Sequence, residues 1–307
     1  MGRWDRDDER SSEPPAPEQA RAERQERAES IRELPEQLTR DRDPDLRARG
    51  HHLTLPSGPD RESVRDDARV YHLRGSEVDL LERAACFRSV FTDDLRRASG
   101  DDAQAHVDLR SLERQGLIEE RTVTRLRDGA VADVITVTDE GKALLDHHRD
   151  PHQDVGQEYY AGWVKPAEIW HDASLLRMCW EMENELGRDG AHIVRIVLDD
   201  ELKARAYAAF HEARQAGRND HDAHTIVAGV QGLHVDDDRF VFPDVRLEVE
   251  DRDGTVRTVD LERITEHYHR GHISGKASAG FQMFGGSSSN RRGGTPHDPH
   301  TIGKLLR

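Results

Sequence analysis

The sequence lacks the features that mark secreted, membrane-spanning or nucleotide-binding proteins. Its 307 residues include only two cysteines, Cys86 and Cys179, whose separation predicts reduced core thiols rather than a disulfide framework. It has no N-terminal apolar run typical of a signal peptide, and no apolar run long enough to span a membrane. It also has no phosphate-binding loop and no glycine-rich dinucleotide motif. We therefore expect a soluble cytoplasmic protein with no nucleotide cofactor.

Aromatic residues are scarce as well, at 5% of the chain, and charged residues are as frequent as hydrophobic ones, at 35% each. A chain of this composition cannot form packed core along its whole length. Residues 1–70 are rich in Arg, Glu and Asp and predict a charged, largely disordered tail. Within it, 20–34 is a possible solitary helix, either solvated or binding a partner. The Gly-, Ser- and Arg-rich stretch 285–307 predicts a flexible tail.

The region 71–150 carries an ordered series of helix and hairpin signals. Ser76 is expected to open one helix, and Thr92 to cap a second helix that ends at Gly100. A third helix is predicted over 103–115. Two strand-like runs follow, joined at Asp128-Gly129, a strong hairpin signal, and Thr138 is expected to cap a closing helix.

This order resembles the winged helix-turn-helix modules of MarR-like regulators, and the segments that carry the resemblance are ERQGLIEE, the hairpin and VTDEGKALL. The resemblance implies binding of double-stranded DNA, with the third helix in the major groove. MarR-like modules commonly dimerise, so a homodimer is plausible.

Helical periodicity predicts which side of the third helix would face DNA. Ala105, Leu109 and Leu112 share one face and should pack inward. The opposite face carries His106, Val107, Arg110 and Arg114. Arginine is a common reader of guanine edges and a general phosphate ligand.

Arg125 and Arg127 flank the predicted hairpin tip and suit a minor groove or a phosphate. Asp108 and Glu113 would dilute the positive surface of the third helix. The net charge of −16 also opposes general attraction to phosphate, so any positive surface must be local.

The region 159–284 predicts a second, α/β domain, in which a first helix is followed by strands, further helices and a final strand, GFQMF. The order helix, strand, strand, strand, helix, strand resembles the restriction-endonuclease-like core, known as the PD-(D/E)xK fold. The resemblance rests on Pro243-Asp244 entering one strand and Asp260-Leu261-Glu262 on the next. With the first domain, it gives an α+β fold class.

The resemblance implies a candidate catalytic site of Asp244, Asp260, Glu262 and Lys276. Two antiparallel strands can bring Asp244 close to Asp260 or Glu262, and Asp244 and Glu262 are the expected ligands of Mg²⁺ or Mn²⁺. The lysine that the family places two residues after the second carboxylate is absent here. Lys276 on the following helix is the natural substitute.

Both domains together resemble the replication-relaxation family of plasmids and integrative elements. The segments that carry this resemblance are WVKPAEIWHDASLLRM, VLDDELK, FPDVRLEVE and VDLERITEHYH. We therefore expect a DNA-binding protein that acts in transcription control or in mobile-element replication or mobilisation. The alternatives are a metal-dependent nuclease and a non-catalytic protein-interaction scaffold.

Overall fold

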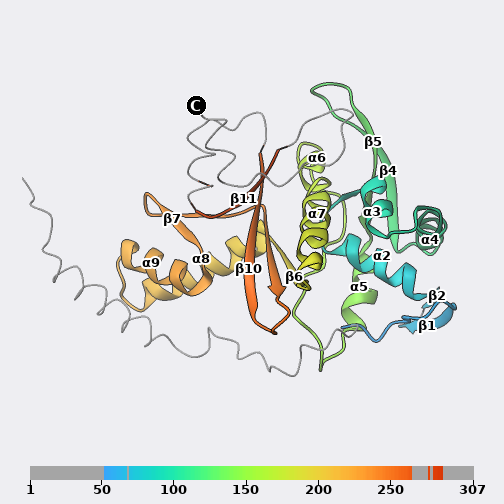
Figure 1. The fold of residues 1–307 in the computed structure, drawn as a ribbon, viewed down its shortest axis with the longest axis horizontal. Helices are drawn as coiled ribbons and strands as arrows, with labels where there is room; N and C mark the ends of the chain where they lie inside the picture. Colours follow the sequence, from blue (N-terminus) through green and yellow to red (C-terminus); the bar gives the residue numbers. More distant parts are fainter. Residues whose placement is uncertain (1–51, 68, 265–275, 277–278, 286–307) are drawn as a thin grey trace, which may run out of the picture.

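The computed structural model describes residues 52–67, 69–264, 276 and 279–285, which form a mixed α+β fold (Figure 1). The possible helix over 20–34 and the tail after Gly285 lie outside the described residues. So does most of the helix expected to carry Lys276, although Lys276 itself is helical.

The first unit is built from helices followed by a hairpin. Its elements are β1 (Glu62–Asp66), β2 (Arg69–Leu73), α2 (Gly75–Ala85), β3 (Val90–Phe91), α3 (Thr92–Ala98), α4 (Asp102–Arg114), β4 (Ile118–Thr124), β5 (Val131–Val137) and α5 (Asp139–His147). β3, β5 and β4 form an antiparallel sheet in that order. The helix order and the Asp128-Gly129 hairpin expected from the sequence are confirmed.

The ordered structure begins earlier than the expected boundary at residue 71. β1 lies inside the segment 1–70 that was expected to be largely disordered, and it pairs with β2. Leu53, Leu55 and Val64 are buried in the core of the first unit. These few apolar residues anchor an otherwise charged stretch, which composition alone could not reveal.

The helix caps differ in part from the expected ones. Thr138 caps α5 as predicted, because its hydroxyl accepts a hydrogen bond from the Gly141 N–H at 3.1 Å. Thr92, however, is the first residue of α3, and its hydroxyl donates to Glu120 instead. α2 begins at Gly75 rather than Ser76, and the Arg74 N–H donates to Glu77 at 3.1 Å. α2 and α3 therefore each begin one residue earlier than Ser76 and Thr92 led us to expect.

The second unit is a sheet with helices. Its elements are α6 (Ile169–Asp172), α7 (Leu175–Arg188), β6 (His192–Leu198), α8 (Asp199–Gln215), α9 (Asp220–Gln231), β7 (His234–Asp236), β8 (Arg239–Val241), β9 (Val245–Glu250), β10 (Val256–Ile264) and β11 (Gln282–Gly285). The sheet order is β11-β10-β9-β6, in which only β10 and β11 are parallel.

The two faces of this sheet differ in polarity because side chains alternate along each strand. Leu247 and Leu261 lie on an apolar face and belong to the same buried cluster as Met182 of α7. The other face holds Arg246 and Glu262, which are both buried. Buried charges on a sheet face need hydrogen-bond or ion-pair partners within the protein. The candidate site described below is made of such partners.

Between β6 and β9 the chain forms an insertion of α8, α9 and the β7–β8 hairpin. It has its own small core, which includes Ala206, Val227 and Phe240. The hairpin turn uses Asp237 and Asp238, both with positive φ. Aspartate tolerates this left-handed conformation better than most residues, which suits Asp237 and Asp238 to the turn.

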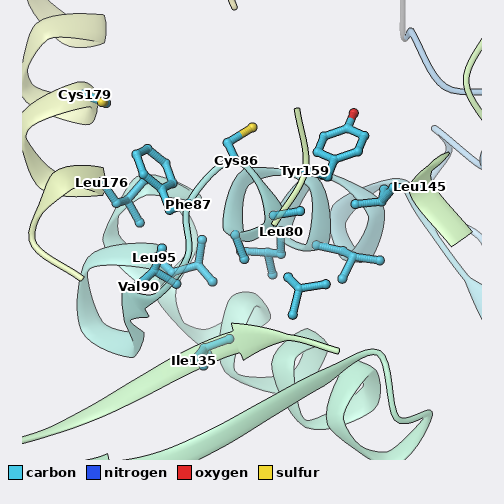
Figure 2. Close-up of a cluster of buried hydrophobic side chains, with 14 of the residues drawn as sticks. Leu80, Cys86, Phe87, Val90, Leu95, Ile135, Leu145, Tyr159, Leu176 and Cys179 are labelled. Carbon is cyan, nitrogen blue, oxygen red and sulfur yellow. The ribbon is translucent and has the colours of Figure 1, made fainter. Parts of the chain in front are cut away.

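One buried cluster joins the two units (Figure 2). Phe87 and Leu95 of the first unit lie in it together with Tyr159 and with Leu176 of α7. The Tyr159 hydroxyl also donates to Glu82 at 2.9 Å. The units therefore share a core rather than being linked by an exposed connection.

Ion pairs surround this shared core. Arg88, which follows α2, contacts Asp172, Asp199 and Asp200 of the second unit. The Arg83 guanidinium lies 2.8 Å from Glu183. Removing one partner of such a partly buried pair leaves an uncompensated charge, so the pairs specify how the units meet.

The buried face of α4 gives a direct test of its orientation. Leu112 is fully buried, whereas Val107 on the same helix is 51% exposed. We expect Leu112→Ala to lower the free energy of unfolding by about 2–5 kcal/mol because it leaves a cavity. Val107→Ala is the matched control and should change it by less than about 0.5 kcal/mol. Denaturant unfolding of both variants checks this, and equal losses would contradict the orientation.

Candidate nucleic-acid interface and carboxylate cluster

The outward face of α4 carries the side chains expected to meet DNA. His106, Val107, Arg110 and Arg114 are exposed, and Ala105, Leu109 and Leu112 are buried, as the periodicity predicted. Asp101 caps the helix by accepting from the Gln104 N–H at 3.0 Å. The helix therefore presents a short polar face with two arginines.

Asp108 does not dilute this face, contrary to the expectation from the sequence. Its side chain is fully buried and pairs with Arg74, and it accepts a hydrogen bond from Gln104 at 2.9 Å. Glu113 does lie beside Arg110, at 3.2 Å. One acidic side chain of α4, Asp108, is thus buried, and another, Glu113, lies beside Arg110 at the surface.

The hollow between α4 and the sheet of the first unit has mixed charge. It encloses about 140 Å³, and its charged lining consists of the acidic residues Asp93, Glu113, Glu120 and Asp133 and the basic residues Arg96, His106 and Arg110. Phosphate groups would be repelled from such a hollow. His106 and Arg110 border both this hollow and the exposed face of α4.

The two hairpin arginines are placed differently. The Arg125 guanidinium lies over the Trp170 ring, 4.6 Å from its centroid, and donates to Asp128 at 2.8 Å. Arg127 is more exposed and lies 3.9 Å from the same carboxylate. The hydrogen bond from Arg125 is the main reason that the pKa of Asp128 is lowered to about 2. Arg125 thus faces the second unit as well as the hairpin tip.

Three of the four candidate residues in the second unit come together. Asp244 precedes β9, and its N–H donates to Glu262 on β10 at 3.2 Å. Lys276 donates to the other Glu262 oxygen at 2.6 Å and to the Phe242 carbonyl at 2.9 Å. Lys276, which follows β10 in the chain, therefore lies in direct contact with Glu262.

Asp260 shares a strand face with Glu262 but has a different partner. Arg246, its neighbour across the strands, donates to both of its carboxylate oxygens, at 2.7 and 2.8 Å. Arg246 also binds the Gln231 and Gly232 carbonyls at the end of α9. Asp260 and Arg246 thus link the sheet to the end of α9, and the carboxylate of Asp260 is paired with Arg246.

His171 joins the cluster, although its sequence spacing gave no sign of this. Its Nε2 lies 3.3 Å from Asp244 and its Nδ1 lies 3.2 Å from Asp172. These two carboxylates raise the pKa of His171 to about 9. Burial tends to raise the pKa of Asp244, but the hydrogen bond from His171 holds it below its usual value.

The carboxylates of this cluster do not fit a divalent metal as they are arranged. Glu262 is fully buried, and its two oxygens accept from Lys276 and from the Asp244 N–H. Asp244 accepts from the Arg263 N–H at 2.8 Å and pairs with His171. In residues 52–67, 69–264, 276 and 279–285, no group of three or more His, Cys, Asp or Glu residues could hold a metal ion. The cluster is a set of neutralised ion pairs.

Comparisons of the chain with protein-family models, with curated proteins and with solved structures give no match. No helix in the described ranges is both long and apolar enough to cross a bilayer.

The raised pKa of His171 predicts a pH dependence of stability. The protonated ring is favoured in the folded state, so its contribution is complete below about pH 6.5 and is lost as the pH rises through about 9. We expect His171→Gln to lower the free energy of unfolding more at pH 6 than above pH 9. Solvent screening limits the difference to the order of 1 kcal/mol.

Denaturant unfolding of both proteins at the two pH values checks this prediction, and an NMR titration of the ring gives its pKa directly. A ring that titrates near 6.5, or a destabilisation that is equal at both pH values, would contradict the placement of His171 between two carboxylates.

Proposed function

We propose that this protein binds double-stranded DNA through α4 and the β4–β5 hairpin. The observation that carries the proposal is the division of α4 into a buried apolar face and an exposed face with His106, Arg110 and Arg114. A helix with such a face can lie in a major groove with its arginines toward bases or phosphates.

The surrounding elements support a winged-helix interpretation of the first unit. The order of three helices, α2, α3 and α4, then the β4–β5 hairpin and the closing helix α5 supports the resemblance to the MarR-like module, and the hairpin follows α4 directly. Arg127 lies at the hairpin tip, where a wing would approach a phosphate or a minor groove.

The second unit is proposed to be restriction-endonuclease-like in topology and to hold DNA or mediate assembly without cleaving it. The sheet order β11-β10-β9-β6 and the convergence of Asp244, Glu262 and Lys276 support the likeness. The neutralised carboxylates favour a non-catalytic role. The process served would be transcription control or the replication or mobilisation of a mobile element.

Neutralising the exposed arginines of α4 tests the DNA-binding role. The double variant Arg110→Gln/Arg114→Gln should bind duplex DNA at least about tenfold more weakly, since each base or phosphate contact contributes on the order of 1 kcal/mol or more. A mobility-shift titration in EDTA at two salt concentrations measures the affinity and its salt dependence.

The matched control is Arg188→Gln/Arg218→Gln, which removes the same charge from exposed positions of the second unit. It should leave the affinity within about twofold of the parent, because neither position lies on α4 or the hairpin. Equal weakening by both double variants would show general electrostatics rather than recognition by α4.

A metal-dependent nuclease is the second candidate function, and the convergence of Asp244, Glu262 and Lys276 favours it. Because Glu262 is buried and fully hydrogen-bonded, we expect no cleavage of supercoiled plasmid with Mg²⁺ or Mn²⁺ above that in EDTA. Asp244→Ala is the control. Cleavage by the parent that disappears in Asp244→Ala would establish the nuclease and overturn the non-catalytic assignment.

A further inference from the structure

Exposed apolar side chains gather at the tip of the β4–β5 hairpin. Leu126 is 96% exposed and Val131 is 64% exposed, which makes them the two most exposed large hydrophobic residues in the described part of the chain. Figure 1 shows the hairpin extending beyond α3 and α4. Val107, on the outer face of α4, is also exposed. The apolar exposure of the described residues is thus concentrated on the two elements proposed to meet DNA.

The two hairpin side chains lie on the same face. Val131 pairs with Thr124 across the strands, and the Arg125 N–H donates to the Ala130 carbonyl at 2.7 Å. Because side chains alternate along paired strands, Leu126 and Val131 lie on the face opposite Arg125. Exposure follows this alternation, since Leu126 and Val131 are exposed whereas Arg125 and Ala130 are half-buried.

The two faces of the hairpin have different neighbours. On one face, the Arg125 guanidinium lies over the ring of Trp170 in the second unit, 4.6 Å from its centroid. The face that carries Leu126 continues along β5 to Asp133, which lines the same hollow as Arg110 of α4. The apolar tip therefore lies on the side of the hairpin that adjoins α4.

The turn that carries Leu126 is held in place by its own hydrogen bonds. The Asp128 carboxylate accepts from the Ala130 N–H at 3.2 Å and from the Arg125 side chain at 2.8 Å. The Gly129 N–H donates to the Arg125 carbonyl at 2.9 Å. A side chain on a preorganised turn loses less conformational freedom on binding than one on a flexible loop.

A narrow groove fits this tip better than another protein surface does. Two side chains offer far less area than the roughly 800 Å² that each partner of a stable protein interface buries. The minor groove of B-DNA is about 6 Å wide, and proteins insert single apolar side chains such as leucine between base steps from this groove. Arg127, half-exposed at the same tip, gives it a positive group suited to the flanking phosphates.

We propose that Leu126, supported by Val131, is an apolar wedge that enters the minor groove of DNA and partly unstacks one base step. The inference rests on the proposed function and deepens it, because it names a residue that reads the deformability of the duplex rather than its hydrogen-bonding groups. Steps from T to A unstack readily, whereas runs of A are stiff. The preferred duplex therefore carries a flexible step beneath the hairpin.

Two duplexes of equal length test the wedge, one of alternating T and A and one of a run of A paired with T. They have the same charge and the same minor-groove acceptors, so deformability and groove shape distinguish them. We expect the full chain to bind the alternating duplex at least about threefold more tightly. Leu126→Ala should bind it about three- to tenfold more weakly and lose the preference, and Leu126→Met should keep most of both. Fluorescence anisotropy titrations measure the affinities.

Two further measurements distinguish a wedge from a phosphate contact or a folding defect. Leu126→Ala should leave the slope of log K against log salt unchanged, because no phosphate contact is lost. A 2-aminopurine in the alternating duplex should brighten on binding the parent but not this variant. Val256→Ala, at the start of β10, is the matched control and should behave as the parent in every assay. Thermal melts should show that both variants fold as the parent does, since both positions are exposed.

The outcomes separate the wedge from the proposed function. If Arg110→Gln/Arg114→Gln weakens duplex binding but Leu126→Ala keeps the affinity and preference of the parent, the wedge is overturned and recognition by α4 stands. A parent that prefers the run of A would indicate arginine in a narrow groove and would also overturn the wedge.

Two other results would reassign the tip. Leu126→Ala that binds duplex as the parent does but has a smaller mass by light scattering would show a contact between copies of this chain, against the wedge. If the parent binds neither duplex even at low salt, both the wedge and the proposed function are overturned.

Discussion

The packing of Trp170 fixes how the two units of this protein meet. Its ring lies edge-on to Phe91 at 5.2 Å and beneath the Arg125 guanidinium at 4.6 Å, so the start of the second unit is held against the sheet and hairpin of the first. The next residue, His171, pairs with Asp244, which lies in the carboxylate cluster. A single short helix, α6, therefore contacts both the proposed DNA-binding hairpin and the neutralised cluster. A displacement of the hairpin would be transmitted through α6 to the cluster.

Local sequence signals predicted those parts of the molecule that local forces determine. The inward face of α4 follows from helical periodicity, and the hairpin follows from Asp128-Gly129. The Thr138 cap depends on a hydroxyl three residues before a backbone N–H. Antiparallel pairing predicted that Asp244 would approach Asp260 or Glu262, and the register, in which Leu261 pairs with Val245, brings Asp244 to Glu262. Such features depend only on residues that are close in the sequence or paired in the strand register.

Other features depend on contacts between distant segments and could not be read from the sequence. His171 reaches Asp244 across more than 70 residues, and Asp108 is buried only because Arg74 is present to pair with it. Arg125 was expected to face DNA, yet its ring contact comes from a different unit. In a chain with so many charges, each Arg has many possible partners, and only the tertiary structure selects one.

The central claim, that α4 and the hairpin face DNA, is tested most directly by site-specific photocrosslinking. A photoreactive amino acid can replace Val107, on the outer face of α4, or Leu126, which is 96% exposed at the hairpin tip. Val70 on β2, also 51% exposed, and Val256 at the start of β10 are the matched controls. Strong crosslinks to labelled duplex from positions 107 and 126, with little from 70 and 256, are the predicted result. No crosslink at 107, or equal yields at all four positions, would contradict the account.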